Sequence, residues 1–228
     1  MILWNAITFL GDTVVLLPVA IVITIWLLME RAWRMAAAWW MLFAMGLTLV
    51  AATKVAFAGW GIGIRFLDFT GLSGHAMRAT AVIPVMLYLI LQKSSRTARM
   101  SGMAAGVGLA TLICVSRVIV RAHSVSEVVA GGLLGAMISA TFIALSQHVL
   151  RHAAYRWLIA FSMAGALGTS HAQPAPTQHW INGVALYLSG RDKPFDRSSW
   201  KTAASKEDCV WYSLLGCGSN PLGRNDQQ

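Results

Sequence analysis

The 228-residue chain is poor in charged residues and in cysteine. Only 12% of its residues are Asp, Glu, Lys or Arg and 57% are hydrophobic, whereas an average soluble domain is about 25% charged. Three cysteines, Cys114, Cys209 and Cys217, cannot form a disulfide framework, and their spacing matches no zinc site. This composition excludes a disordered chain, a coiled coil and an ordinary nucleic-acid-binding domain. The net charge of +9 is typical of membrane topology in a chain this apolar.

Long apolar segments dominate the first three quarters of the chain. A membrane-spanning helix needs about 20 mostly apolar residues, and no segment shows the alternation of a membrane β-strand. We therefore predict an all-α fold, a polytopic transmembrane helical bundle of five to six spans. The tryptophans, Trp39, Trp40 and Trp60 among them, are expected to serve mostly as interface anchors. The predicted spans are 13–29, 36–57, 76–91, 100–120 and 125–147, with a shorter sixth at 157–168.

Basic residues gather in alternate loops, which sets the orientation in the membrane. The loops after the first, third and fifth spans are the basic ones, and the positive-inside rule makes their side cytoplasmic. We expect a multi-pass protein of the bacterial inner membrane whose opposite face meets the periplasm. The basic residues of these loops are Arg31, Arg34, Lys93, Arg96, Arg99, Arg151 and Arg156.

The chain divides into an apolar part and a polar end. We predict a transmembrane domain over residues 1–172 and a polar C-terminal tail over 173–228. If the short sixth segment crosses the membrane, the tail is periplasmic, and Cys209 and Cys217 could pair in that oxidising compartment. If the segment only lies in the interface, the tail is cytoplasmic and both thiols stay reduced. The periplasmic tail is the favoured prediction.

Two polar patches lie at span ends on one membrane face. Ionisable groups at membrane depth are costly and are therefore functional candidates. In the second patch, His123 and Glu127 are four positions apart on one helical face. A carboxylate there can orient the imidazole and leave its other nitrogen free to attack. Arg117, one loop away, offers a planar fork of donors that suits phosphate oxygens.

The first patch, Ser73-Gly74-His75, begins the third span. Gly74 allows close backbone approach, and backbone N–H groups at a helix start can hold an anion. Ser73 adds a hydroxyl donor, and His75 a second imidazole able to give a proton. Together the two patches are typical of phosphoryl transfer through a histidine nucleophile. The alternatives are structural: an ion pair at one helix start and a helix cap with an interfacial histidine at the other.

These residues resemble the motifs of the type 2 phosphatidic acid phosphatases, the lipid phosphate phosphatases that share their site with vanadium haloperoxidases. The family pattern Ser-Arg-x5-His-x3-Asp reads Ser116, Arg117, His123 and Glu127 here, with Glu in place of Asp. The resemblance covers residues 11–135. It implies the helical core of that family.

The other two family blocks are matched less closely. The Pro-Ser-Gly-His block reads Leu72-Ser73-Gly74-His75. The Lys-x6-Arg-Pro block has only Lys54, followed eleven positions later by Arg65. Glycines between these two residues make a continuous helix through both improbable.

The resemblance implies a role for each matching residue. His123 would be the nucleophile that forms a phosphohistidine, Glu127 would orient it, and His75 would protonate the leaving group. No metal or other cofactor is implied. Arg78, one turn after His75, is expected to pair with Asp68 or to reach the interface, although it could touch substrate. The phosphate oxygens would be held by Arg117, Ser73 and the Gly74 backbone, with Lys54 and Arg65 assisting.

The implied function is hydrolysis of the phosphate or diphosphate of a lipid such as phosphatidic acid or undecaprenyl diphosphate. The expected partners are this substrate and membrane lipids, with no nucleic acid. One alternative is a lipid phosphotransferase, and another is a non-catalytic lipid-phosphate binder or transporter with a degenerate site. The sequence selects neither the particular lipid nor the oligomeric state.

Overall fold

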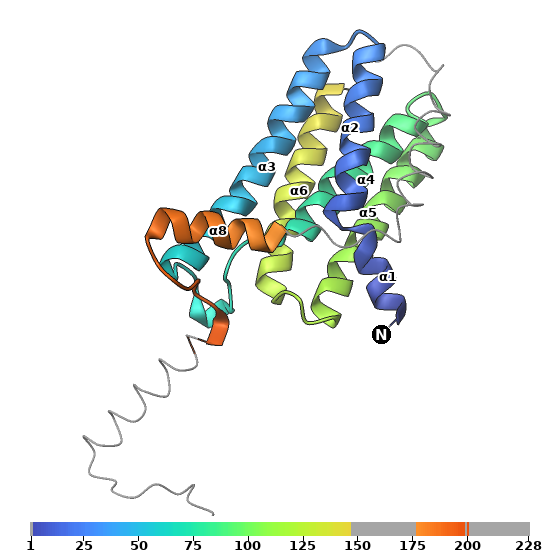
Figure 1. Ribbon diagram of the computed structural model, residues 1–228. Helices are drawn as coiled ribbons and strands as arrows, with labels where there is room; N and C mark the ends of the chain where they lie inside the picture. Colours follow the sequence, from blue (N-terminus) through green and yellow to red (C-terminus); the bar gives the residue numbers. More distant parts are fainter. Residues whose placement is uncertain (1, 147–176, 199, 201–228) are drawn as a thin grey trace, which may run out of the picture.

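The structure is a computed structural model that describes residues 2–146, 177–198 and 200. Within these residues the chain is helical and contains no strand beyond an isolated bridge between Ile64 and Phe69 (Figure 1). The all-α prediction is confirmed. The helices are α1 (Ile2–Leu10), α2 (Thr13–Met29), α3 (Trp33–Trp60), α4 (Gly74–Leu91), α5 (Arg96–Ile119), α6 (Val125–Ser146) and α8 (Thr177–Ser189), with a 3-10 turn, η1 (Arg65–Leu67).

Five helical segments are long and apolar enough to cross a membrane. They correspond to the five longer predicted spans, because each apolar run is bounded by residues that start or stop a helix. The first candidate span, Leu3–Met29, also takes in α1, which Gly11 and Asp12 separate from α2. The predicted sixth span, 157–168, lies outside the described residues. The five apolar helical segments indicate a membrane protein.

Local signals set the helix ends that form the site. Asp12 caps α2 by accepting a hydrogen bond from the backbone N–H of Val14, and Ser73 caps α4 through Ala76. Gly61 ends α3 in the left-handed region, with a φ of 71°, which glycine adopts without steric cost. Helix α3 thus ends before Arg65, as the glycines of this stretch predict.

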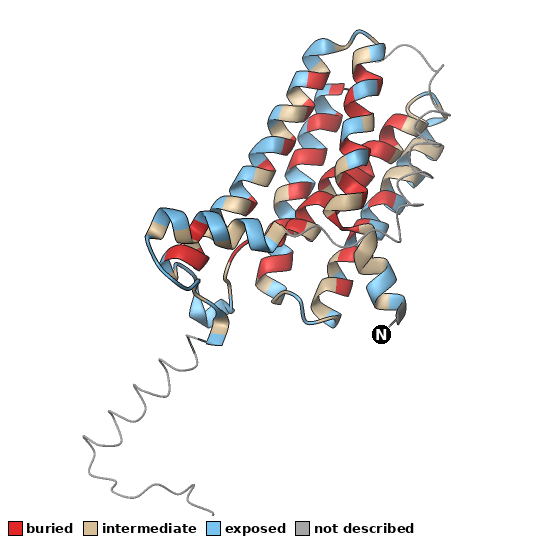
Figure 2. Ribbon diagram, viewed as in Figure 1, coloured by how far each residue is buried: buried red, intermediate tan, exposed pale blue. Residues whose placement is uncertain are grey.

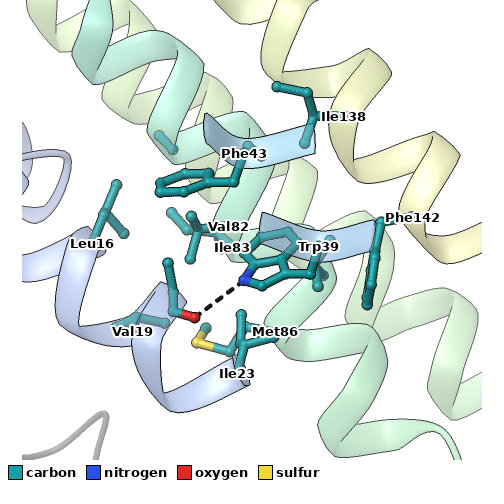
Figure 3. Packing of buried hydrophobic residues seen from close by; sticks show 14 of the residues in the cluster. Leu16, Val19, Ile23, Trp39, Phe43, Val82, Ile83, Met86, Ile138 and Phe142 are labelled. Atoms are coloured by element: carbon teal, nitrogen blue, oxygen red, sulfur yellow. Dashed lines mark hydrogen bonds between the residues drawn. The ribbon is translucent and has the colours of Figure 1, made fainter. Parts of the chain in front are cut away.

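The core lies where α2, α3, α4 and α6 meet, and buried residues line the inward faces of these helices (Figure 2). Trp39 is fully buried there. Its ring stacks on Phe43 with the centroids 5.5 Å apart, and it meets the edge of Phe142 at 5.2 Å. The indole N–H donates to the carbonyl of Ala20 at 3.1 Å (Figure 3). Trp39 is therefore a core residue and not the interface anchor expected from sequence, because its polar atom has a partner inside the bundle.

Helices α4 and α6 pack at unusually short range because glycines face α4. A side chain at Gly131 would place its Cβ 2.5 Å from the carbonyl oxygen of Ser73. A Cβ at Gly135 would overlap the carbonyl oxygen of Met77 and the hydroxyl of Thr80. Small residues of this kind let membrane helices approach closely. The contact places the start of α4 directly beside the start of α6.

We expect Gly135→Ala to destabilise the bundle, because its methyl group meets backbone that cannot move aside. Overpacking of this kind costs about 1–3 kcal/mol. The matched control is Gly108→Ala in α5, where an added Cβ has no atom within 4 Å. Thermal unfolding in detergent should show a lower midpoint for Gly135→Ala and an unchanged or higher one for Gly108→Ala. Equal midpoints would contradict the close contact between α4 and α6.

Candidate active site

Two cavities of about 490 and 460 Å³ open at the end of the bundle where α3 ends and α4 and α6 begin. Lys54, Ala122, His123 and Gln178 line both cavities. His75, Arg78 and Arg117 line the second, together with the apolar side chains of Leu47, Val50, Ala51, Trp180 and Ile181. The structure thus brings the two predicted patches to one place.

His123 lies in the turn between α5 and α6 and is held by Glu127. Nδ1 of His123 is 2.7 Å from Oε2 of Glu127, whose side chain is 1% exposed. The same carboxylate oxygen accepts from the backbone N–H of Ser124 at 3.3 Å. Because Nδ1 is engaged, Nε2 is the ring nitrogen available for chemistry. The pairing predicted from the four-residue spacing is present, although Glu replaces the usual Asp.

The second carboxylate oxygen of Glu127 has partners that the sequence did not indicate. Oε1 accepts from both the backbone N–H, at 2.8 Å, and the hydroxyl of Thr70. It also lies 2.8 Å from Nη2 of Arg197, which follows α8. Thr70 comes from the loop before α4, so three separate segments converge on this carboxylate. No spacing in the sequence points to Thr70 or Arg197.

His75, the second residue of α4, faces a carboxylate of its own. Its Nε2 lies 3.3 Å from Oδ2 of Asp12. Asp12 is only 7% exposed although it begins a membrane span. Sequence reasoning missed it, but there was a signal: an acidic residue at the edge of an apolar run is costly without a partner. Both site imidazoles therefore have a carboxylate partner.

Three cationic side chains gather at the same end of the bundle. Lys54 of α3, Arg78 of α4 and Arg117 of α5 line the cavity that also contains His75. Among the described residues, the Nε atoms of Arg78 and Arg117 are buried without a hydrogen-bond partner. Buried donors are almost always paired, so these two indicate a place for an anion. These side chains suit phosphate oxygens.

Arg78 differs from its sequence-based prediction. The sequence favours a pair with Asp68 or a position at the interface over contact with substrate, whereas the structure buries Arg78 in the lining of the cavity. Asp68 lies instead beside Arg197, with 3.5 Å between Asp68 Oδ1 and Arg197 Nε. The difference arises because the loop 61–72 carries Asp68 out to the surface, while α4 turns Arg78 inward.

Of the remaining predicted site residues, some line the cavities and others do not. Gly74 lines the cavity, whereas Ser73 is fully buried and uses its hydroxyl to cap α4. Lys54 borders both cavities. Arg65 is exposed in η1 and is not among the residues that line either cavity. The structure therefore does not bring Arg65 to the others.

The protonation of His123 is set by its surroundings. Burial lowers the pKa of its imidazole below the ordinary value, and the hydrogen bond to Glu127 partly offsets that effect. The positive charges of Lys54 and Arg117 lower the pKa further. The neutral imidazole, which is the nucleophilic form, is therefore favoured at neutral pH.

The start of the predicted tail belongs to this end of the molecule. Helix α8 lies across the end of α3 in Figure 1. The backbone N–H of Phe195 donates to the carbonyl of Ala58 at 2.8 Å, and the Trp200 ring meets the edge of Phe57. The proposed boundary at residue 172 stays a prediction, since residues 147–176 lie outside the described part. Cys209 and Cys217 also lie outside it.

Comparison with known proteins identifies the family. Residues 65–151 match the PAP2 superfamily. The chain is also 37% identical over 200 residues to a Klebsiella pneumoniae protein named "Uncharacterized 22.5 kDa protein in cps region". The aligned region covers 86% of this chain and 96% of that protein. No solved structure matches. The chain belongs to the PAP2 superfamily, and membership supports a phosphatase-type activity.

The position of α8 can be tested by cross-linking. A Cβ built at Gly59 lies 3.4 Å from Cβ of Ser189, and disulfides join Cβ atoms about 3.5–4.5 Å apart. With the native cysteines replaced by serine, Gly59→Cys with Ser189→Cys should form a disulfide, seen as faster migration on a non-reducing gel.

The matched control pairs Gly59→Cys with Gly183→Cys, since Gly183 is in the same helix but a Cβ there has nothing within 4 Å. This pair should stay reduced. Equal cross-linking of both pairs, or of neither, would show that α8 does not lie against α3.

Proposed function

We propose that the protein is a phosphatase of the bacterial inner membrane that hydrolyses the phosphate or diphosphate of a lipid through a phosphohistidine on His123. The observation that carries the proposal is the His123–Glu127 pair, 2.7 Å apart, beside a cavity walled by Lys54, Arg78 and Arg117. The arrangement combines an oriented nucleophile with preorganised positive charge.

The proposed reaction has two steps. In the first, Nε2 of His123 attacks phosphorus, a P–N bond forms, and the P–O bond to the leaving group breaks while His75 donates a proton to that oxygen. In the second, water attacks phosphorus, His75 takes its proton, and the P–N bond breaks to release phosphate and restore His123. Glu127 stabilises the imidazolium formed in the first step, and Asp12, 3.3 Å from His75, keeps that ring oriented.

The shape of the second cavity supports an amphipathic substrate. Its lining combines the cationic side chains of Arg78 and Arg117 with apolar side chains that include Leu47, Val50 and Trp180. A phosphate beside the arginines would therefore have its organic part against hydrocarbon side chains. Phosphatidic acid and undecaprenyl diphosphate are candidate substrates of this kind.

The orientation is proposed from charge. The turns that contain Arg31 and Lys93 follow α2 and α4, at the opposite end of the bundle from the site. Short basic loops favour the cytoplasmic side, so the site would face the periplasm.

The nucleophile is tested by His123→Ala. We expect phosphate release from lipid phosphates in detergent to fall by at least about 10³-fold, because no other group replaces the attacking nitrogen. Acid-labile label from ³²P-substrate should also disappear from the quenched protein. His179→Ala, which removes an exposed histidine of α8, is the matched control and should keep full activity. Activity of His123→Ala above a few per cent would rule out the phosphohistidine.

Glu127→Gln tests the carboxylate. An amide can accept from His123 with its oxygen, but its NH₂ group then faces the donors of Thr70 and Arg197. We expect kcat to fall by about 10²–10⁴-fold while the protein remains folded in detergent. Wild-type turnover in Glu127→Gln would show that the negative charge is not needed.

The two alternatives predict different products. A phosphotransferase would transfer the labelled phosphate to a second lipid instead of releasing it. A non-catalytic binder would retain the lipid phosphate unchanged and acquire no label on His123.

A further inference from the structure

We propose that Arg197, carried over the site by the C-terminal segment, is a positioning residue that acts on His123 through Glu127. This proposal rests on the proposed function, in which His123 is the nucleophile. It adds a residue that lies outside the part of the chain that matches the PAP2 superfamily, residues 65–151.

Arg197 reaches a buried carboxylate from the outside of the bundle. Its Nη2 lies 2.8 Å from Oε1 of Glu127, and its side chain is 37% exposed whereas that of Glu127 is 1% exposed. Its Nε lies 3.5 Å from Oδ1 of Asp68 at the surface. The guanidinium therefore bridges a surface carboxylate and the carboxylate that holds the nucleophile. Arg197 also lines the larger cavity with His123.

The segment is held on both sides of Arg197. Before it, the Phe195 backbone N–H bonds to Ala58, and the guanidinium of Arg191 lies 4.1 Å from the centroid of the Phe195 ring. After it, Trp200 packs edge-on against Phe57 with the ring centroids 5.2 Å apart. These contacts fix the backbone against the end of α3, so no further backbone ordering is needed when Arg197 meets Glu127.

The charge of Arg197 bears on His123 through the shared carboxylate. Glu127 holds His123 with one oxygen and Arg197 with the other. The other charged groups that face His123 are Lys54 from α3 and Arg117 from α5. With Arg197 in place, the Glu127 charge is balanced even while His123 is neutral. Without Arg197, protonated His123 becomes the nearest counter-charge, which raises the pKa of its imidazole.

The test compares Arg197→Ala, Arg197→Lys and the matched control Lys193→Ala. Lys193 is an exposed cation on the same segment. For Arg197→Ala we expect kcat/KM at neutral pH to fall at least tenfold. In the pH profile of kcat/KM, the acidic limb should move to higher pH by about 0.5–2 units. Arg197→Lys keeps the positive charge but not the planar fork of donors. The acidic limb of its pH profile should therefore lie close to that of the wild type, while its kcat/KM should be only partly restored. Lys193→Ala should stay within twofold of wild type with an unshifted limb.

A second measurement needs no turnover. The imidazole of His123 can be titrated by NMR in histidine-labelled protein, with the resonance assigned by its absence in His123→Ala. Its pKa should be higher in Arg197→Ala than in wild type and unchanged in Lys193→Ala. Arg197→Lys separates charge from loosening: it should leave the pKa of His123 near the wild-type value, whereas a loosened segment that exposes His123 to water would raise that pKa in Arg197→Lys as well.

The outcomes separate the two proposals. The proposed function is wrong if the wild type releases no phosphate from lipid phosphates, or if His123→Ala keeps more than a few per cent of the activity. In either case the NMR titration still decides the role of Arg197. An unshifted His123 titration in Arg197→Ala overturns that role, whether or not activity falls. Full activity with an unshifted acidic limb in Arg197→Ala overturns it as well.

Discussion

The site depends on how closely α4 can approach α6. Gly131 and Gly135 contribute no side chain to the contact, and the backbone N–H of Ser73 donates to the carbonyl of Glu127 at 3.1 Å. That single bond ties the start of one helix to the start of the other. His75 and Glu127 are therefore placed by backbone packing, which is stiffer than any contact between long side chains could be. Larger residues at these glycines would separate the two histidines.

Charge is the second constraint, because the site lies at the edge of an apolar bundle. Moving a charged side chain to the middle of a membrane span costs about 2.5–3.5 kcal/mol. The chain places Asp12, Lys54, Arg78, Arg117 and Glu127 near one another, where opposite charges offset part of this cost. The offset is incomplete: the Nε atoms of Arg78 and Arg117 lack hydrogen-bond partners among the described residues. An anionic substrate would complete the balance, which is the electrostatic logic of the proposed phosphate site.

The carboxylate of Glu127 connects three separate segments of the chain. Its carboxylate serves His123 with one oxygen, while the other meets Thr70 and Arg197. The superfamily core, residues 65–151, supplies the first two contacts, and a later segment supplies the third. The described part of the polar tail is thus packed against the site and is not separate from it.

Much of the bundle could be predicted from local signals. A span is an apolar run of about 20 residues, so five spans were recognisable one at a time. The His123–Glu127 pair follows from a four-residue spacing, although His123 lies in the turn before α6 and not on the helix itself. The start of α4 follows from Ser73 as its cap. Trp39 was misplaced because burial depends on which face of α3 meets α2 and α6, and that information is not local.

Only the tertiary structure decided which residues from distant segments contact Glu127 and His75. Thr70 is 57 positions from Glu127, and Asp12 and Arg197 come from still more distant segments. The position of Asp12 at the edge of an apolar run indicates that it needs a partner but not which one, and nothing in the neighbourhood of Thr70 or Arg197 marks either residue. Arg78 and Arg65 were both basic residues near the motifs, yet only Arg78 faces the cavity. The physical reason is that a spacing fixes geometry within one helix, whereas contacts between helices depend on packing that the whole bundle sets.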